Sequence, residues 1–260
     1  MSDFVRPGAA LSGQDSRSRS AGHLPQVSRV LAVCAHPDDE SFGLGAVLGA
    51  LSDRGATTRV LCFTHGEAST LGETSRPLDE VRAEELSAAA VFLGVDEVTL
   101  LDYPDGHLEE VPLEELAQKV NEAVGPAEIL LVFDEGGITG HPDHCAATAA
   151  ALLAARRDEL PVLAWAVPEH VASVLNAEFG TSFLGRGDSE VDLVVTVDRG
   201  RQRQAIACHV SQSTDNPVLW RRLELLGSTE SLRWLRLPLG IAGAREHVAP
   251  ASPDSDGGES

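Results

Sequence analysis

Short runs of β-branched and other apolar residues alternate along the chain with stretches in which apolar residues recur at helical spacing. The apolar runs are typical of buried strands, and they occur at residues 28–35, 58–64, 98–101, 128–133, 161–167 and 191–197. The amphipathic stretches predict helices at residues 43–54, 78–93, 113–123, 142–157 and 199–210. Strands that alternate with helices imply crossover connections and a mostly parallel sheet covered on both faces, so we expect an α/β fold.

The end residues of two predicted helices support this pattern. Gly94 directly follows residues 78–93, in the position where a helix often ends on a left-handed glycine. Pro142 suits the first turn of residues 142–157, and the arginine pair at the other end suits the negative pole of the helix dipole. We therefore expect both helices to have the bounds that the apolar pattern indicates.

The two ends of the chain lack the strand and helix pattern. Residues 1–28 and 247–260 contain no long apolar run, and each is expected to be a disordered tail. The segment between them, residues 29–246, shows no repeat and no dividing linker. It is long enough to bury a core of its own, so we predict a single domain there.

Charge and composition exclude several classes of function. The chain has 40 Asp and Glu against 20 Lys and Arg, for a net charge of −20, and such a surface repels nucleic acids and anionic membranes. There is no apolar stretch of membrane-spanning length and no signal-peptide pattern near the start. The four cysteines are widely spaced without a C-x-x-C motif, which favours a reduced compartment. We therefore expect a cytoplasmic protein without membrane or nucleic-acid partners.

Two polar turns follow buried strands of the predicted sheet. Ala-His-Pro-Asp-Asp-Glu occupies residues 35–40, and Gly-His-Pro-Asp-His occupies residues 140–144, after the strand at 128–133. The carboxyl ends of parallel strands meet at one edge of a sheet, where ligands of open α/β folds bind. Two imidazoles and a carboxylate from these turns would form a zinc site with a fourth position open for water. A carboxylate outside that site could then accept the proton of the water.

Spacing alone leaves the individual roles open. It does not decide which of Asp38, Asp39 and Glu40 binds the metal, nor which of His141 and His144 does. A single histidine or aspartate of this kind is more often a hydrogen-bonded structural residue or a helix cap. Two such turns, each after a buried strand, nevertheless favour a functional site over that structural explanation.

The residues of these turns resemble those of the LmbE-like, or PIG-L, family of zinc N-deacetylases. The resemblance covers most of residues 30–212. Besides the two turns, it rests on shorter motifs that occur in family order: H-G-E at 65–67, R-x-E-E-L at 82–86, L-G-V at 93–95, P-D-G at 104–106 and A-x-x-x-H-x-S-Q at 205–212. The family fold is a Rossmann-like three-layer α/β sandwich, which agrees with the alternation of strands and helices.

The resemblance implies roles that spacing left open. It assigns His36, Asp39 and His144 to one Zn²⁺ per chain, although other divalent metals remain compatible with these ligands. It makes Asp38 the general base that activates water. It makes His141 the residue that stabilises the tetrahedral intermediate and protonates the departing amine.

Further positions match family residues around the metal. Asp143 is expected to orient a histidine ligand. Arg82 and Asp105 match positions that contact the substrate sugar. His209 receives no role, because a buried hydrogen-bonded histidine explains it equally well. The chain departs from some family members because residues 134–140 contain no tyrosine, and Tyr103 lies elsewhere.

The resemblance implies a zinc-dependent hydrolase that removes the acetyl group from an N-acetylglucosaminyl or related N-acyl conjugate. The partner is then a small molecule, and the products are acetate and a free amine. Two alternatives within the family are an amidase acting on a thiol–sugar conjugate and a metal-binding member without catalysis. Whether the chain forms a homo-oligomer is left open.

Two unrelated enzyme classes fit the sequence less well. The glycines at residues 43–49 match a dinucleotide-binding fingerprint only loosely, and they follow three acidic residues that would repel a pyrophosphate. We interpret them as small residues that let a helix pack closely on the sheet. A serine hydrolase is disfavoured because the chain has no G-x-S-x-G motif.

Overall fold

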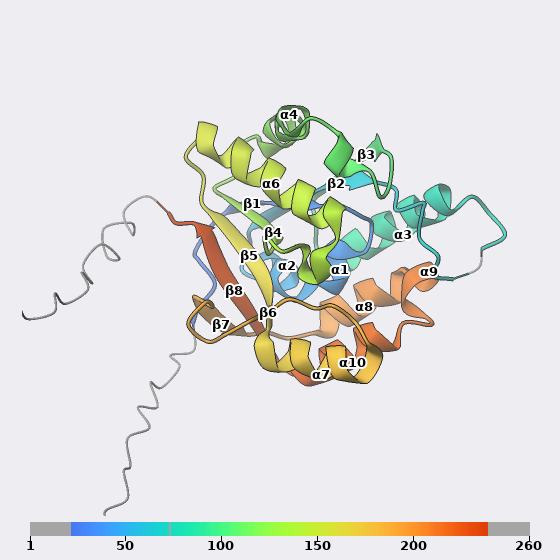
Figure 1. Cartoon of the computed structure of the whole chain (residues 1–260). Coiled ribbons are helices and arrows are strands. Elements are labelled where there is room, and N and C mark those ends of the chain that lie inside the picture. The colour runs from blue at the N-terminus through green and yellow to red at the C-terminus, as the bar shows by residue number, and fades with distance from the viewer. Residues whose placement is uncertain (1–21, 73, 239–260) are drawn as a thin grey trace, which may run out of the picture.

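The computed structural model describes residues 22–72 and 74–238 of the chain. Within these residues an eight-stranded sheet has the order β3-β2-β1-β4-β5-β8-β7, and the short β6 pairs with β5 (Figure 1). The strands are β1 (Arg29–Cys34), β2 (Thr57–Thr64), β3 (Glu97–Tyr103), β4 (Ile129–Phe133), β5 (Val162–Pro168), β6 (Gly185–Arg186), β7 (Leu193–Thr196) and β8 (Thr229–Arg236).

The sheet is mixed but mostly parallel, as the sequence predicted. β1 pairs in parallel with both β2 and β4, and the parallel pairing continues to β3 on one side and to β5 on the other. β8 is antiparallel to both of its neighbours, β5 and β7. β8 therefore inserts into the sheet between two strands that precede it in the chain.

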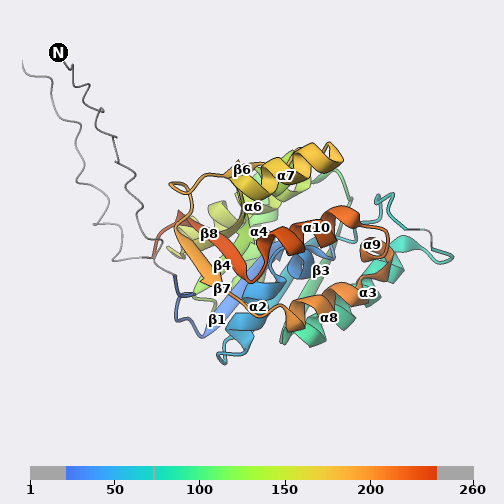
Figure 2. The same ribbon diagram turned by 90° about the horizontal axis from the view of Figure 1, so that it is seen from below.

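Helices cover both faces of this sheet (Figures 1 and 2). They are α1 (Asp39–Phe42), α2 (Gly45–Ser52), α3 (Leu78–Leu93), the 3₁₀ turn η1 (Leu108–Glu110), α4 (Leu113–Val124), α5 (Gly137–Gly140), α6 (Pro142–Arg157), α7 (Glu169–Phe179), α8 (Gly200–Cys208), α9 (Val210–Ser213) and α10 (Pro217–Leu226). α4 and α6 pack on one face, while α2, α3 and α8 pack together on the other. The result is the expected three-layer α/β sandwich.

The apolar run of β1 shows why both faces need helices. Its side chains alternate between two cores: Leu31 and Val33 pack with residues of α4 and α6, whereas Val30 and Ala32 pack with residues of α2 and α3. A strand in the centre of a parallel sheet buries both of its sides, so its sequence is apolar throughout.

The helix predictions are confirmed where the end signals were clear. α3 spans Leu78–Leu93 and ends at Gly94, which has the left-handed φ of 71°. α6 begins at Pro142 and ends with its arginine pair, as predicted. The small-residue interpretation of the glycine run also holds, because a Cβ on Gly43 would come within 2.3 Å of the Phe133 ring. α2 therefore follows a close approach of backbone to side chain that only glycine permits.

The predicted disorder of residues 1–28 is wrong for the part that the structure describes. The Gly22 N–H donates to the Val194 carbonyl of β7 at 2.9 Å, and Leu24 is buried in the core. Burial of the Leu24 side chain helps to hold this segment against the domain, although the composition of the segment is mostly polar. Residues 1–21 and the predicted tail at 247–260 lie outside the described residues.

No helix in the described part of the chain combines the length and the apolar character that a bilayer span requires.

Candidate metal centre and active site

The two polar turns meet at the carboxyl ends of β1 and β4, which are neighbouring parallel strands. His36 lies in the turn between β1 and α1, Asp39 is the first residue of α1, and His144 comes from the first turn of α6. Each of the three offers one potential ligand atom, and these atoms all lie within 4.8 Å of one another. The fold therefore brings together the three residues that the resemblance assigned to the metal.

Hydrogen bonds determine which atom of His36, Asp39 and His144 faces the space between these three residues. The Nδ1 of His144 lies 3.1 Å from the Gly137 carbonyl, and its Nε2 lies 3.1 Å from Asp39 Oδ1 and 3.2 Å from His36 Nδ1. The other Asp39 oxygen, Oδ2, accepts the backbone N–H groups of Ala35 and His36 at 3.0 Å each. The atoms left to face one another are thus two imidazole nitrogens and one carboxylate oxygen.

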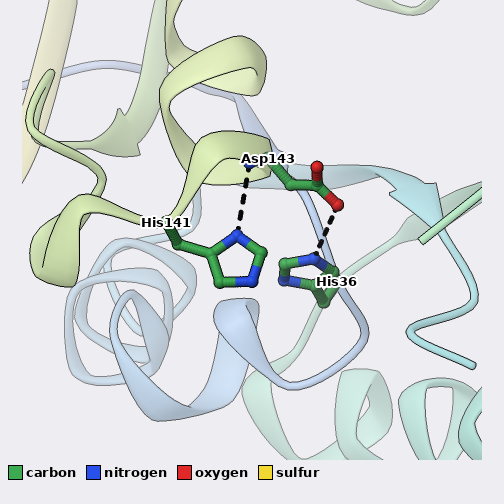
Figure 3. A group of neighbouring side chains, drawn as sticks. All are labelled: His36, His141 and Asp143. Carbon is green, nitrogen blue, oxygen red and sulfur yellow. Dashed lines mark hydrogen bonds and ion pairs between the residues drawn. The ribbon is translucent and has the colours of Figure 1, made fainter. Parts of the chain in front are cut away.

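Asp143 holds the remaining nitrogen of His36, as Figure 3 shows. Its Oδ2 lies 3.2 Å from His36 Nε2, and the Asp105 Oδ1 lies 3.0 Å from the same nitrogen. The Asp143 side chain is fully buried and accepts backbone N–H groups of Gly106 and Leu108 at 2.7 and 3.0 Å. A carboxylate behind a histidine ligand fixes the ring and its tautomer, which is the position predicted for Asp143.

This donor set fits a divalent cation. Burial opposes a charge on His36, but its hydrogen bonds to Asp105 and Asp143 prevail and raise the pKa of the imidazole to about 10. Burial likewise favours neutral Asp39, but His144 and His36 together lower its pKa well below the usual range. The pocket therefore favours positive charge beside an ionised carboxylate, and metal ions bind such sites by displacing protons. Two histidines and one carboxylate are ligands that zinc accepts.

His141 lies beside this cluster but is turned differently. It caps α6, and its Nδ1 accepts the Asp143 N–H at 3.2 Å (Figure 3). Burial and then the neighbouring His144 and His36 lower the pKa of the His141 imidazole. The ring is therefore neutral at pH 7, and since Nδ1 accepts a hydrogen bond, the proton resides on Nε2. His141 thus offers a neutral N–H donor to the site.

Asp38 stands next to the metal-facing cluster in a strained backbone conformation, with φ 120° just before α1. Its Oδ2 lies 3.0 Å from the Nη2 of Arg82. Burial raises the pKa of Asp38 to about 6, although Arg82 opposes the rise. The carboxylate is therefore ionised at pH 7 yet close to the point where it can take up a proton, which suits a general base.

Arg82 and Asp105 are engaged with the protein's own residues. Arg82 is buried, pairs with Asp38, and donates to the carbonyls of Gly66 at 2.6 Å and of Pro37. Asp105 faces His36 and also accepts the Ala68 N–H at 2.8 Å. Both line the cavity described next, so they remain placed to touch a ligand. Their contacts with Asp38 and His36 show that they also position these two residues.

A cavity of about 370 Å³ opens over the cluster. Its wall includes all the predicted site residues except Asp143, and it also contains residues that the sequence analysis did not single out. These are mainly aromatic or polar and come from later parts of the chain: Trp165, Phe183, Gln212 and Arg222. Trp165 lies in a run predicted as a buried strand, whereas Phe183, Gln212 and Arg222 lie in segments for which the sequence predicted no strand or helix. Gln212 is the last residue of the family motif at 205–212, whereas no sequence signal marked the other three.

Contacts describe the surroundings of His209 and Tyr103, two residues without an assigned role. His209 is buried and its Nε2 lies 2.8 Å from Glu40 Oε1, so its structural explanation is the one that the contacts support. Tyr103 donates its hydroxyl to Glu115 at 2.9 Å and does not replace the tyrosine missing from residues 134–140. Ile138 and Thr139 of that segment line the cavity instead.

Comparison with known proteins places this site in a family. The family model described as PIG-L, GlcNAc-PI de-N-acetylase, matches residues 31–155. A 1D-myo-inositol 2-acetamido-2-deoxy-α-D-glucopyranoside deacetylase of Nakamurella multipartita is 30% identical over 71% of this chain and 80% of its own length. The chain belongs to the PIG-L family. A probable N-acetyl-α-D-glucosaminyl L-malate deacetylase 2 of Bacillus anthracis is also 30% identical, over 79% of this chain and 91% of that protein.

Other PIG-L relatives differ in length, and solved structures share the fold. The inositol-conjugate deacetylase of Kineococcus radiotolerans is 33% identical, but the match spans only 53% of its length and 60% of this chain. Teicoplanin deacetylase superposes with a TM-score of 0.61 at 19% identity, covering 79% of this chain and 97% of its own. The N,N'-diacetylchitobiose deacetylase of Pyrococcus horikoshii gives 0.60 at 23% identity, covering 86% and 87%.

The family assignment and the Rossmann-like sandwich expected from the sequence are thereby confirmed. The named relatives also confirm the expected enzyme class, a deacetylase that hydrolyses an amide bond.

Proposed function

We propose that the protein is a zinc-dependent hydrolase that removes the acetyl group from an N-acetylglucosaminyl small-molecule conjugate. The observation that carries this proposal is the convergence of His36 Nδ1, Asp39 Oδ1 and His144 Nε2 in a cavity that also contains Asp38 and His141. The relatives named for deacetylation of glucosaminyl conjugates support the substrate class.

The proposed cofactor is one Zn²⁺ per chain, held by His36, Asp39 and His144. When bound, zinc acts as a Lewis acid on the amide carbonyl and eases the ionisation of water. Asp143 keeps the ring of His36 turned so that its Nδ1 faces the ion.

Asp38 and His141 have different parts in the proposed reaction. Asp38 accepts a proton from the water that attacks the acetamide carbon, because its carboxylate is ionised at pH 7. His141 donates a hydrogen bond from its Nε2–H to the carbonyl oxygen as negative charge develops there, since its Nδ1 is committed to the Asp143 N–H. The C–N bond then breaks, and the departing nitrogen takes the proton held by Asp38, because neutral His141 keeps its one N–H. The free amine and acetic acid leave, and the acid ionises to acetate.

Substrate contacts by Arg82 and Asp105 are part of the same proposal. Both line the cavity beside His36 and Asp38, and each retains a cavity-facing surface in addition to its contacts within the protein. Within the proposal, the conjugate is a small molecule and the enzyme works in the cytoplasm.

The test measures acetate released from methyl N-acetylglucosaminide and from larger N-acetylglucosamine conjugates by zinc-loaded protein. Asp38→Asn is expected to lower kcat by about 10²–10⁴-fold while zinc content stays at one per chain. The matched control is Asp53→Asn, because Asp53 is exposed and pairs with Arg201 outside the cavity. Release that persists in Asp38→Asn, or in protein freed of metal by a chelator, would contradict the proposal.

A further inference from the structure

Arg222 is a buried cation in the wall of the same cavity. It lies on α10 and is only 8% exposed, and its guanidinium carbon sits 5.1 Å from the centre of the Trp165 ring. Its Nη2 donates to the Phe42 carbonyl at 2.8 Å, whereas its buried Nε has no hydrogen-bond partner among residues 22–72 and 74–238. An arginine carries five N–H donors, so the protein engages only part of this group.

The charge of Arg222 is not balanced by a carboxylate in the part of the chain that the structure describes. Among the described residues no Asp or Glu forms an ion pair with it. Glu230 is the acidic residue that acts on it most strongly, but Glu230 already accepts from Trp165 Nε1 at 2.7 Å and pairs with Arg199. Burial lowers the pKa of Arg222 to about 10, so it is still charged at pH 7. A buried charge without a partner is costly, which is why it marks a place for an anion.

A row of side chains connects this cation with the metal-facing cluster. The ring centroids of His144 and Phe133 lie 4.9 Å apart, and those of Phe133 and Trp165 lie 5.3 Å apart. The Arg222 guanidinium lies over the Trp165 ring. All four residues line one cavity. Arg82 and Asp105 reach the cluster from α3 and from the loop after β3, whereas this row comes from β4, β5 and α10. A substrate held near the metal ligands therefore has room to extend toward Arg222 along an aromatic wall.

Asp38 and Asp39, the acidic residues of the cluster, do not satisfy Arg222. Asp38 pairs with Arg82, and Asp39 faces His144 and the backbone of the first turn. The cavity thus presents two separate groups that attract different parts of a ligand.

We propose that Arg222 is an anion subsite that binds a carboxylate carried by the substrate. This inference rests on the proposed deacetylase function and narrows its substrate class. A planar guanidinium stacked on a tryptophan ring is suited to two parallel hydrogen bonds with a carboxylate. The carboxylate belongs either to the aglycone of the N-acetylated sugar or to the far end of a larger N-acyl group that takes the place of acetyl, and the test separates these two sources.

The test uses two pairs of probes that differ only in charge. The first pair is the 2-carboxyethyl and 2-carbamoylethyl glycosides of N-acetylglucosamine, which place the carboxylate or its amide on the aglycone. The second pair is methyl glucosaminide with an N-succinyl or an N-succinamoyl group, which places it on the acyl chain. The zinc-loaded protein is expected to prefer the carboxylate in one pair by about 10- to 100-fold in kcat/KM. Arg222→Gln is expected to reduce that ratio to about one.

Controls separate charge recognition from structural damage. Arg221→Gln removes the neighbouring arginine, which pairs with Glu178 and Glu224 on the surface, and it should keep the preference. Arg222→Lys keeps the charge but loses the planar fork, so it should keep part of the preference even if Arg222→Gln folds poorly. A purely structural Arg222 would lower kcat/KM equally for both members of a pair. Equal use of both members by the wild-type protein in both pairs, or a preference unchanged in Arg222→Gln, would overturn the proposal.

Binding measured without turnover distinguishes this proposal from the deacetylase function. In the Asp38→Asn background, calorimetry reports the dissociation constants of the same four probes. A carboxylate preference that depends on Arg222 supports the subsite even if no acetate is ever released. Hydrolysis of the neutral probes, which releases acetate from the 2-carbamoylethyl glycoside or succinamate from the N-succinamoyl compound, supports the amide hydrolase and overturns the subsite if it occurs without any such preference.

Discussion

The two ends of the active-site cavity are built in contrasting ways. At the metal-facing end, His36 and Asp39 lie three residues apart in one turn, and His144 comes from a similar turn on the neighbouring strand. Each of these side chains has its second polar atom held by a backbone group or a carboxylate. At the other end, Trp165 and Arg222 lie 57 positions apart in the chain, and the Nε of Arg222 has no hydrogen-bond partner among the described residues.

The contrast suggests that one end of the cavity serves catalysis and the other serves substrate recognition. The family model matches residues 31–155, which include every proposed metal ligand and neither Trp165 nor Arg222. The end with His36, Asp39 and His144 suits a reaction that needs fixed geometry, because misplaced ligands lower both metal affinity and the rate of reaction. The end with free donors suits recognition of a part of the substrate that does not react.

The strongest test of the contrast removes a ligand from the metal-facing end. His144→Ala is expected to abolish zinc binding and to lower acetate release by at least about 10³-fold, because several kcal/mol of charge stabilisation are lost with the ion. Zinc content by atomic absorption and acetate release measure the two effects. His107→Ala is the matched control, since His107 is exposed and pairs with Glu110. Full zinc content in His144→Ala would remove that residue from the proposed ligand set.

A smaller effect on zinc binding is expected at Asp143, which contacts the ligand His36. Asp143→Asn keeps the shape of the side chain but removes the charge that holds His36 Nε2, so zinc affinity should fall by about 10- to 100-fold. Competition with a chromophoric chelator gives the dissociation constants. Asp102→Asn is the control, because Asp102 makes a similar contact to a histidine, 3.0 Å from His65 Nε2, outside the cavity wall. Equal zinc affinity in Asp143→Asn and Asp102→Asn would show that the contact to His36 does not tune the metal.

The smallest effect is expected at Tyr103. Its hydroxyl bonds to Glu115 and not to the cavity, so Tyr103→Phe should leave kcat/KM within about twofold and cost at most about 1 kcal/mol of unfolding free energy. Steady-state kinetics and urea unfolding measure the two quantities. A large loss of activity at unchanged stability would mean that this tyrosine serves the reaction after all.

The same contrast explains how much the sequence could predict. The turns at residues 35–40 and 140–144 were recognisable because strand, turn and helix signals are all local. Their convergence also followed from the parallel sheet. Spacing could not separate His141 from His144, because the distinction lies in a cap: His141 accepts the Asp143 N–H, whereas His144 Nδ1 faces the Gly137 carbonyl. The family resemblance, not the spacing, supplied that assignment.

Other features of the fold and the cavity could not be predicted, mainly because they depend on contacts between distant parts of the chain. β8, Thr229–Arg236, has arginines at positions 233 and 236 and does not read as a buried strand, yet it lies between β5 and β7. α10 was not predicted either, so Arg222 had no structural context in the sequence. The strained φ of Asp38 was equally invisible, because nothing local marks a non-glycine residue for that conformation.

The place of β8 inside the sheet has a consequence for synthesis on the ribosome. The chain emerges from the ribosome with its N-terminus first. All the proposed zinc ligands have been translated by the end of α6, whereas β5, β8 and β7 are translated later. A chain interrupted between α6 and β5 would carry every ligand but expose β4 as an open edge, which strands of other chains can pair with. During translation, all the proposed ligands are therefore present before the strands that cover the edge of β4 have been made.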